Sequence, residues 1–508
     1  MTCKSARTPQ NYGEVAPHEV KGKVNYMSEI KFYSGEQVPL EMHKVRMVQR
    51  VYLLPVEERA QRIQIAGYNT FLLQNKDIFL DMLTDSGVNA MSENQYASML
   101  QADDSYAGSE TYYRLEAVLK DMFGMEYFLP AHQGRACEHI LARLLVKPDS
   151  VAVMNYHFTT SKAHIYAMGG TVEEIIIDEG LHINSDLPFK GNMDISKLEE
   201  AIARLGKEKI SFIRIEAGTN LIGGQPVSME NMRQASKICR RAGIPLVFDA
   251  SLLSDNLYFI KVREAEYKDT DVIEITREIG SLMDVIYFSA RKLGAARGGG
   301  ILTSDRGMFL QMREMIPLYE GFLTYGGMSV REMEAMSIGL RESLDMDIIN
   351  QTPIFVEVLC NELIKKGIPV VTPPGGLGCH VDARQFCSHL SQDEYPAGAL
   401  AAALYLAAGV RGMERGTLSE QRNPDGTEAV SKMELVRLAF PKRVFTLSQV
   451  KYVADRLTWL YENRSLIGGL EFEDEPKVLR FFFGRLKPKG NWPNALIRKF
   501  REDFGESL

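Results

Sequence analysis

Strands and helices alternate through the middle of the chain, and the spacing of apolar residues marks each of them. Short apolar runs that end on a polar or charged residue occur at 150–155, 209–216, 244–249 and 285–289. Segments with apolar residues at helical spacing, such as 229–242, lie between them. Strands that alternate with helices of ten or more residues predict a mostly parallel sheet covered on both faces. We therefore predict an α/β fold.

The pattern also suggests where domains begin and end. Residues 1–48 are polar and contain spaced prolines, so we expect an N-terminal arm. Residues 92–345 hold the alternating pattern and form the predicted large domain. Residues 49–91 and 346–486 mix helices with short strands, which indicates a smaller α+β domain. Residues 487–508 are a C-terminal extension, predicted to be a basic linker followed by a short amphipathic helix.

Composition narrows the classes of partner. The chain has 508 residues, of which 45% are hydrophobic, so it can bury a large core. A net charge of −7 does not favour binding to nucleic acid or to an anionic membrane. The sequence has no apolar run of membrane-spanning length and no signal-peptide pattern, so we expect a cytoplasmic protein. Its six cysteines are scattered without a CxxC pair, which argues against a zinc site and a disulfide framework.

Two charged residues stand where predicted strands end. Asp249 closes the run Ile244-Pro-Leu-Val-Phe-Asp249, and Lys292 follows the run that ends at Ser289. In open α/β sheets, ligands bind beyond the carboxyl ends of the strands. Pyridoxal phosphate needs a lysine for its Schiff base and a carboxylate for its ring nitrogen. The pair therefore suggests this cofactor, with a solvated lysine at a sheet edge as the alternative.

Further strand ends carry groups that suit such a ligand. The turn Pro130-Ala-His-Gln-Gly-Arg135 opens a helix, so its free N–H groups and its arginine would suit a phosphate. The segment 155–164 offers aromatic and hydroxyl groups for a planar ligand. Its two histidines lack spaced carboxylate or thiol ligands, so we favour packed or surface histidines over a metal site.

Two polar residues leave alternatives open. Asn220 lies in a glycine-rich turn before a helix and could reach a ring oxygen, although a plain turn explains it equally well. Arg437 stands among Leu435, Leu438 and Phe440, where a charge is costly unless an anion pairs with it. It is either a buried arginine that awaits a carboxylate or an arginine on the solvated face of an edge strand.

Eight segments together resemble the β-eliminating lyases, the family of tyrosine phenol-lyases and tryptophanases. The resemblance covers about residues 40–486 in order and with nearly constant spacing. It implies the aspartate-aminotransferase-like fold of pyridoxal-phosphate enzymes (fold type I) and a homotetramer built from dimers. The segments are Leu83-Thr-Asp-Ser-Gly87, Ser105-Tyr-Ala-Gly-Ser109, His132-Gln-Gly-Arg135, Asn220 with Gly223-Gly-Gln-Pro-Val-Ser228, Ser289-Ala-Arg-Lys292, Tyr325-Gly-Gly327, Met413-Glu-Arg-Gly416 and Glu475-Pro-Lys-Val-Leu-Arg-Phe-Phe482.

The resemblance assigns the cofactor-binding residues position by position. Lys292 would hold pyridoxal phosphate and later move the substrate α-proton, and Asp249 would keep the ring nitrogen protonated. Phe158 would stack on the ring, and Asn220 would bond its phenolic oxygen. The phosphate would be bound by Gln133, Gly134, Arg135 and Ser289.

The resemblance also assigns substrate and cation sites. Arg437 would bind the substrate α-carboxylate, and Tyr106 would protonate the leaving ring carbon. Three positions, Thr159, Arg415 and Phe481, favour the tyrosine branch of the family over the tryptophan branch. Thr159 and Arg415 would then hold a phenolic hydroxyl. The remaining implied positions are Thr84 and Ser86 near the carboxylate, and Asp104 and Gly87 beside a monovalent cation such as K⁺.

Four positions depart from the family pattern. Leu252 replaces an arginine that bonds the cofactor's phenolic oxygen, and Leu377 replaces a histidine. Arg291 stands for a lysine and Lys162 for an arginine. Because a nearby cation disfavours a protonated Schiff base, loss of the arginine should raise the pKa of that linkage. The cofactor apparatus is otherwise intact, while its electronic tuning and the surroundings of the substrate are altered.

Three alternative functions are compatible with these residues. The first is cleavage of the Cβ–Cγ bond of tyrosine, or a related aromatic amino acid, to phenol, pyruvate and ammonia. The second is β-elimination, β-replacement, transamination or oxidation of another amino acid with the same cofactor. The third is a scaffold or regulatory subunit without catalysis, which the presence of Lys292, Asp249, Arg135, Tyr106 and Arg437 disfavours.

Overall fold

A seven-stranded sheet organises the middle of the chain in the computed structural model, which describes residues 33, 40–423 and 425–508. The strand order is β2-β8-β7-β6-β5-β3-β4, and β8 alone runs against its neighbours. The predicted, mostly parallel sheet is therefore confirmed. The strands are β2 (Tyr127–Ala131), β3 (Val151–Met154), β4 (Thr171–Glu174), β5 (Ile210–Glu216), β6 (Leu246–Asp249), β7 (Val285–Ser289) and β8 (Gly299–Thr303).

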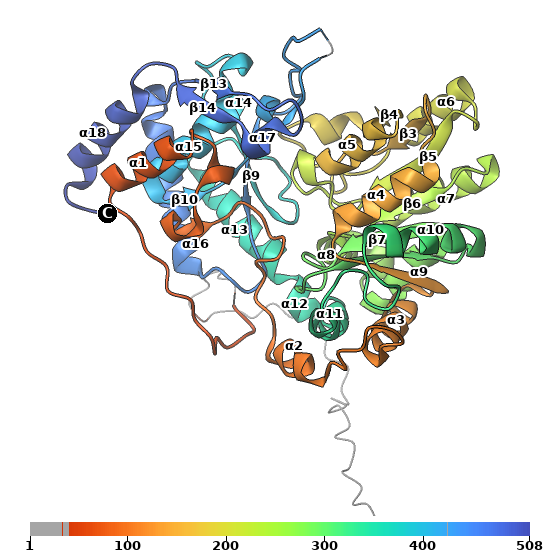
Figure 1. Ribbon diagram of the computed structural model, residues 1–508. Helices are drawn as coiled ribbons and strands as arrows, with labels where there is room; N and C mark the ends of the chain where they lie inside the picture. The colour runs from red at the N-terminus through yellow and green to blue at the C-terminus, as the bar shows by residue number, and fades with distance from the viewer. Residues whose placement is uncertain (1–32, 34–39, 424) are drawn as a thin grey trace, which may run out of the picture. The chain divides into compact units, whose positions relative to one another are not determined.

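Helices cover both faces of this sheet because its strands are apolar on both sides. Residues such as Ile213, Ile215 and Phe248 point to one face, and Phe212 and Val247 point to the other. Figure 1 shows α10 beside α4. The first face packs on α3 (Glu110–Phe123), α6 (Ile195–Leu205), α7 (Met229–Ala242), α8 (Leu253–Arg263), α9 (Val272–Leu282) and α11 (Val330–Glu342), and the second on α4 (Gly134–Leu145), α5 (Thr159–Ala167) and α10 (Arg306–Tyr319).

A separate apolar core lies around α15 (Pro396–Ala408), every residue of which is buried. A three-stranded antiparallel sheet of order β11-β12-β9 lies beside it. Its strands are β9 (Gly378–Asp382), β11 (Met413–Arg415) and β12 (Leu435–Ala439), and the helices around the core include α1 (Val56–Ile65), α13 (Gln351–Lys365), α14 (Ala383–Phe386), α16 (Leu447–Glu462) and α18 (Trp492–Phe504). Figure 1 shows α1 (red), near the start of the chain, beside α15 and beside α18 (blue), which lies near its end.

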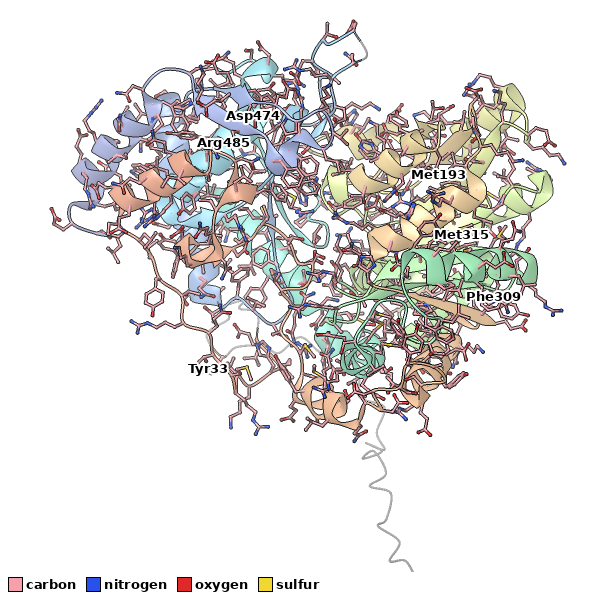
Figure 2. All side chains as sticks on the ribbon, in the orientation of Figure 1. Tyr33, Met193, Phe309, Met315, Asp474 and Arg485 are labelled. Atoms are coloured by element: carbon pink, nitrogen blue, oxygen red, sulfur yellow. The ribbon has the colours of Figure 1, made fainter. Side chains whose placement is uncertain are left out.

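The C-terminal segment is more ordered than a linker. Residues 485–488 form β14 (Arg485–Pro488), which pairs with β13 (Leu470–Asp474). Asp474 and Arg485, which are paired in this register, are labelled in Figure 2. Phe500 of α18 is completely buried in the core around α15. The expected short amphipathic helix is therefore present as α18, whereas the expected linker before it is wrong at residues 485–488, which pair as a strand.

Other expectations stand as follows. Most of the predicted N-terminal arm, 1–48, lies outside the described residues, and the domain boundaries at 48, 91, 345 and 486 stay predictions. Five cysteines are buried and unpaired among the described residues, while Cys3 lies outside them. Within the described part of the chain, we find no helix long and apolar enough to cross a membrane.

Close packing of α9 on α3 predicts the effect of one substitution. A Cβ added at Gly280 would overlap the carbonyl oxygen of Phe123, a backbone atom that cannot swing away. We expect Gly280→Ala to lower the free energy of unfolding by about 2 to 3 kcal/mol, because overpacking forces the helices apart. The measurement is urea-induced unfolding, with the neighbouring exposed Ser281→Ala as the control. Equal stability of the two variants would contradict this packing.

Candidate active site

A cavity of about 440 Å³ lies at the carboxyl ends of the sheet strands. Its wall also includes Arg415 of β11, Arg437 of β12 and Phe481 of α17 (Arg480–Phe483). Residues predicted for cofactor and substrate, far apart in the sequence, therefore meet in one place. Those that line the cavity are Lys292, Asp249, Gln133, Gly134, Arg135, Phe158, Ser289, Thr159, Arg415, Arg437, Thr84, Ser86 and Phe481.

A row of polar side chains crosses three adjacent strands at the floor of this cavity. The sheet register pairs Glu216 of β5 with Asp249 of β6, and Asp249 with Tyr287 of β7. Arg214 lies two residues before Glu216 and therefore points to the same face of the sheet. Its Nη2 donates to Oδ2 of Asp249 at 2.6 Å, and its Nε donates to the hydroxyl of Tyr287 at 2.9 Å.

Arg214 keeps Asp249, the central carboxyl group of this row, in its charged form. Burial opposes ionisation of Asp249, but Arg214 and Ser251 outweigh it, so the pKa of Asp249 lies below its ordinary value. Burial raises the pKa of Glu138, which lies beside Tyr287 and accepts from Thr160 and Ser161. Asp249 is thus a buried carboxylate held in its charged form, as a partner for a protonated ring nitrogen must be.

The start of α4 forms a cradle suited to a phosphate. Gln133 caps this twelve-residue helix without a side-chain hydrogen bond, which leaves N–H groups at the positive helix end. A Cβ on Gly134 would come within 2.9 Å of the Ser289 Cβ, so the space between them admits no side chain. Arg135 is exposed beside this turn. These residues fit the phosphate of the expected cofactor.

Three further residues predicted to bind the cofactor are Lys292, Phe158 and Asn220. Nζ of Lys292 lies 5.4 Å from the centroid of the Phe158 ring. Asn220 is completely buried, although it does not line the cavity. Its Oδ1 accepts from Arg437 at 2.6 Å, while its Nδ2 has no partner among the described residues. A free buried donor is costly unless a ligand accepts from it, and a phenolic oxygen would do so.

Two buried arginines line the cavity without a carboxylate partner. Among the described residues, neither Arg415 nor Arg437 forms an ion pair, and both keep unpaired N–H groups. Burial lowers the pKa of Arg437 to about 9 and that of Arg415 to about 10. The guanidinium carbon of Arg415 lies about equally far from the rings of Phe158 and Phe481. Since a buried cation needs an anion, these groups suit a carboxylate and a phenolic oxygen.

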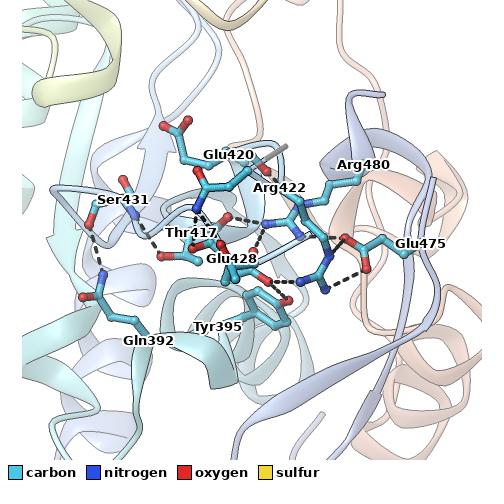
Figure 3. A network of polar contacts seen from close by, with 12 residues as sticks. Gln392, Tyr395, Thr417, Glu420, Arg422, Glu428, Ser431, Glu475 and Arg480 are labelled. Atoms are coloured by element: carbon cyan, nitrogen blue, oxygen red, sulfur yellow. Dashed lines mark hydrogen bonds and ion pairs between the residues drawn. The ribbon is translucent and has the colours of Figure 1, made fainter. Parts of the chain in front are cut away.

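Phe481 and Phe482 are held in the wall by a polar network shown in Figure 3. The guanidinium of Arg480 is completely buried and bonds Glu428 and Glu475. It also donates to the carbonyl oxygens of Glu420, at 2.7 Å, and Thr417, at 2.9 Å. One side chain thus ties α17 to the segment that follows β11.

The two apolar departures from the family pattern pack together. Leu252 and Leu377 form a small buried cluster with Ala439. Leu252 lines the cavity, so an apolar wall stands where an arginine was expected to donate. The other two departures remain polar: Nε of Arg291 is 3.4 Å from the Ser86 hydroxyl, and Lys162 pairs with Glu420 at 3.4 Å.

Four predicted residues lie outside this cavity's lining: Asn220, described above, and Tyr106, Asp104 and Gly87. Tyr106 is 69% exposed, and its ring stacks on Phe322. Asp104 is exposed and pairs with Arg331 at 3.3 Å, while the Gly87 N–H donates to the Arg291 carbonyl. No cluster of three or more histidine, cysteine or acidic side chains fit for a metal occurs in the described part of the chain.

Sequence reasoning missed several residues of this cavity. Arg214, Glu216, Glu138 and Tyr287 were not predicted, although all but Arg214 line the cavity and Arg214 lies directly beneath it. A signal existed, since Arg214 and Glu216 are charged residues two apart within an apolar strand, which places both on one face. Their pairing with Asp249 depends on strand register, which a single sequence does not reveal.

Comparison with known proteins gives close relatives. Residues 81–456 match the family model described as beta-eliminating lyase. Tyrosine phenol-lyase of Symbiobacterium thermophilum is 43% identical over 450 residues, which cover 88% of this chain and 98% of that protein. Tyrosine phenol-lyase of Pasteurella multocida is 42% identical over 453 residues, or 89% of this chain and 99% of that protein.

Solved structures at low identity share the fold. A serine palmitoyltransferase from Sphingomonas wittichii has a TM-score of 0.52 at 12% identity and covers 76% of this chain and 88% of its own. Threonine aldolase from Leishmania major has a TM-score of 0.53 at 15% identity and covers 75% of this chain and 99% of its own. The predicted fold is confirmed.

The pocket wall behind Arg415 predicts a pH effect on stability. Burial raises the pKa of Glu414 to about 7 from 4.5, and its oxygens accept from Gly416 and Ser419. A raised folded pKa means that the charged form opposes folding, so the cost grows as pH rises from 4.5 through 7. We expect Glu414→Gln to gain about 2 kcal/mol more unfolding free energy at pH 8 than at pH 5.

The measurement is denaturant unfolding of both proteins at the two pH values. Glu473→Gln, at an exposed position, is the control and should give no such difference. A lower unfolding free energy for Glu414→Gln than for wild type at pH 8 would contradict the prediction, because the charged carboxylate would then stabilise the wall.

Proposed function

Because the chain belongs to the β-eliminating lyase family, we propose that it cleaves the Cβ–Cγ bond of tyrosine, or a related aromatic amino acid, with pyridoxal phosphate. With one water consumed, the products would be phenol, pyruvate and ammonia. The observation that carries this proposal is the pair of unpaired buried arginines, Arg415 and Arg437, in one cavity with Lys292 and Asp249.

Each end of the substrate has a partner in this proposal. Arg437 binds the α-carboxylate by a two-pronged contact, and Thr84 and Ser86 line the wall nearby. Thr159 and Arg415 hold the phenolic hydroxyl, while Phe481 packs against the ring and excludes water. Binding of two oxygen groups would satisfy the N–H groups that Arg415 and Arg437 leave free.

The proposed chemistry needs two proton transfers. Lys292 would hold the cofactor in the resting enzyme, and its Nζ, once released by the substrate amine, would take the proton from the substrate Cα. When bound, pyridoxal phosphate supplies an electron sink for the charge that develops at Cα. Asp249 holds the proton on the ring nitrogen, and Arg214 keeps Asp249 charged for this task. The hydroxyl of Tyr106 delivers a proton to the ring carbon that leaves.

The exposure of Tyr106 bears on the assembly. A proton donor that is 69% exposed, outside the lining of its own chain's cavity, would act on a second copy. We propose a homotetramer built from dimers, in which Tyr106 of one chain completes the cavity of its partner. K⁺ at Asp104 and Gly87 would have to compete with Arg331 for the carboxylate. The proposed location is the cytoplasm.

A second candidate is the same cofactor chemistry on another amino acid. Leu252 lines the cavity and packs on Leu377, where the family pattern expects two polar side chains. A substrate without a phenolic ring would gain little from Arg415 and Thr159. The two candidates therefore differ in whether phenol is released.

The direct test is a reaction of the purified protein, loaded with pyridoxal phosphate, with tyrosine. We expect equal amounts of phenol and pyruvate. We also expect Lys292→Ala to lower turnover about a thousandfold or more, because it removes both the cofactor linkage and the α-proton acceptor. A panel of amino acids is assayed in parallel for pyruvate. Turnover of another amino acid without phenol from tyrosine would favour the second candidate.

Mixed assemblies test the position of Tyr106. We expect Tyr106→Phe and Lys292→Ala each to be nearly inactive alone. If Tyr106 acts on the partner's cavity, unfolding and refolding equal amounts of the two variants together should restore roughly a quarter of wild-type activity. About half of the dimers are then mixed, and each mixed dimer has one intact site of its two. Mixing each variant with itself is the control. No recovery, with mixed dimers demonstrated, would place Tyr106 at its own chain's site.

A further inference from the structure

A second carboxyl group, Glu216, reaches the floor of the cavity, and the proposed reaction does not use it. Glu216 ends β5, lines the cavity together with Lys292, and is 4% exposed. It is the neighbour of Asp249 in the strand register, so the two carboxyl groups stand side by side on one face of the sheet. Its place in the wall is therefore fixed by the sheet.

The carboxyl group of Glu216 accepts two hydrogen bonds from the described residues, and both are long. Oε1 accepts from the Asn220 N–H at 3.3 Å, and Oε2 accepts from Nη1 of Arg214 at 3.4 Å. The same arginine contacts Asp249 at 2.6 Å, so its charge is directed mainly to Asp249. Glu216 is therefore weakly compensated compared with its neighbour.

The charged groups around Glu216 come from three strands and one turn. They are Arg214 on its own strand, Asp249 on β6, Lys292 after β7 and Arg415 on β11. Burial raises the pKa of Glu216 to about 7, and Asp249 adds to this rise, while Arg214 and Lys292 oppose it. Glu216 therefore gains and loses its proton near neutral pH.

The same site lacks the cation that the family pattern places at its edge. Leu252 occupies that position and packs on Leu377 and Ala439. Glu216 adjoins Asn220, the residue expected at the phenolic oxygen of the cofactor. The cavity wall that contains Lys292 thus carries an acidic side chain at position 216 and an apolar one at position 252.

We propose that Glu216 is a positioning residue that holds the proton on the Schiff-base linkage between Lys292 and pyridoxal phosphate, by placing a negative charge near it in place of the missing cation. This inference rests on the proposed cofactor and deepens the proposed function. A negative charge favours the protonated linkage, and protonation makes its carbon more open to attack by the substrate amine.

The test is a pH titration of the visible absorption of bound pyridoxal phosphate, which changes when the linkage loses its proton. We compare wild type, Glu216→Gln and Glu216→Asp between about pH 5.5 and 9.5. Glu216→Gln keeps the size and an acceptor for Asn220 but removes the charge, so we expect its midpoint to fall by about one pH unit. Glu216→Asp keeps the charge and should stay closer to wild type.

Controls separate a charge effect from a structural one. Glu264→Gln neutralises a part-buried acid directly after α8 and outside the cavity lining, so it should leave the midpoint unchanged. Thermal unfolding and cofactor content are measured for every variant. Loss of cofactor in Glu216→Gln alone, with unchanged folding, would overturn the proposal, because binding rather than protonation would then depend on this residue.

The outcomes separate a failure of the proposed role of Glu216 from a failure of the proposed cofactor. A wild-type absorption band that Lys292→Ala abolishes supports the cofactor, and an unshifted Glu216→Gln midpoint would then refute the role of Glu216 alone. If the wild-type linkage stays protonated throughout the range, Glu216→Gln must bring its midpoint into that range, or the role is refuted. Absence of any band in wild type would refute both.

Discussion

The ion pair between Arg214 and Asp249 is the constraint on which the site depends. Three carboxyl groups, Glu138, Glu216 and Asp249, lie close together in a region shielded from water. Without a cation, they would take up protons rather than stay charged, because buried like charges repel. Removing one partner of such a buried pair typically costs about 3 to 5 kcal/mol. Arg214 thus makes an ionised Asp249 compatible with a stable core.

This constraint is met by the register of the sheet rather than by a loop. Glu216, Asp249 and Tyr287 are aligned across β5, β6 and β7, and Arg214 reaches them from the same face. A slip of one residue in β5 would turn both Arg214 and Glu216 into the apolar layer beneath α7 and α9. The packing of that layer, where Ile213 and Ile215 are completely buried, therefore fixes the charges of the site as well as the fold.

The sequence predicted the parts of this molecule that local pattern controls. The alternation of strands and helices gave the parallel sheet, and polar residues at strand ends, such as Asp249 and Lys292, marked the cavity. The Arg214 pair and the Arg480 network escaped prediction because each joins segments distant in sequence, whose contacts depend on register and packing. The exposure of Tyr106 was not predicted either, because the local motif that identifies a residue does not say which cavity that residue faces.

Leu252 and Leu377 are best understood as one change rather than two. An arginine at 252 facing a leucine at 377 would bury a charge against an apolar side chain, and the reverse pair would leave a polar ring without a partner. Replacing both by leucine gives a closed contact with Ala439 and leaves no unpaired polar side chain at that contact. At the cavity floor, charge is then supplied by Arg214 and Glu216, whose positions are fixed by the register of the strands.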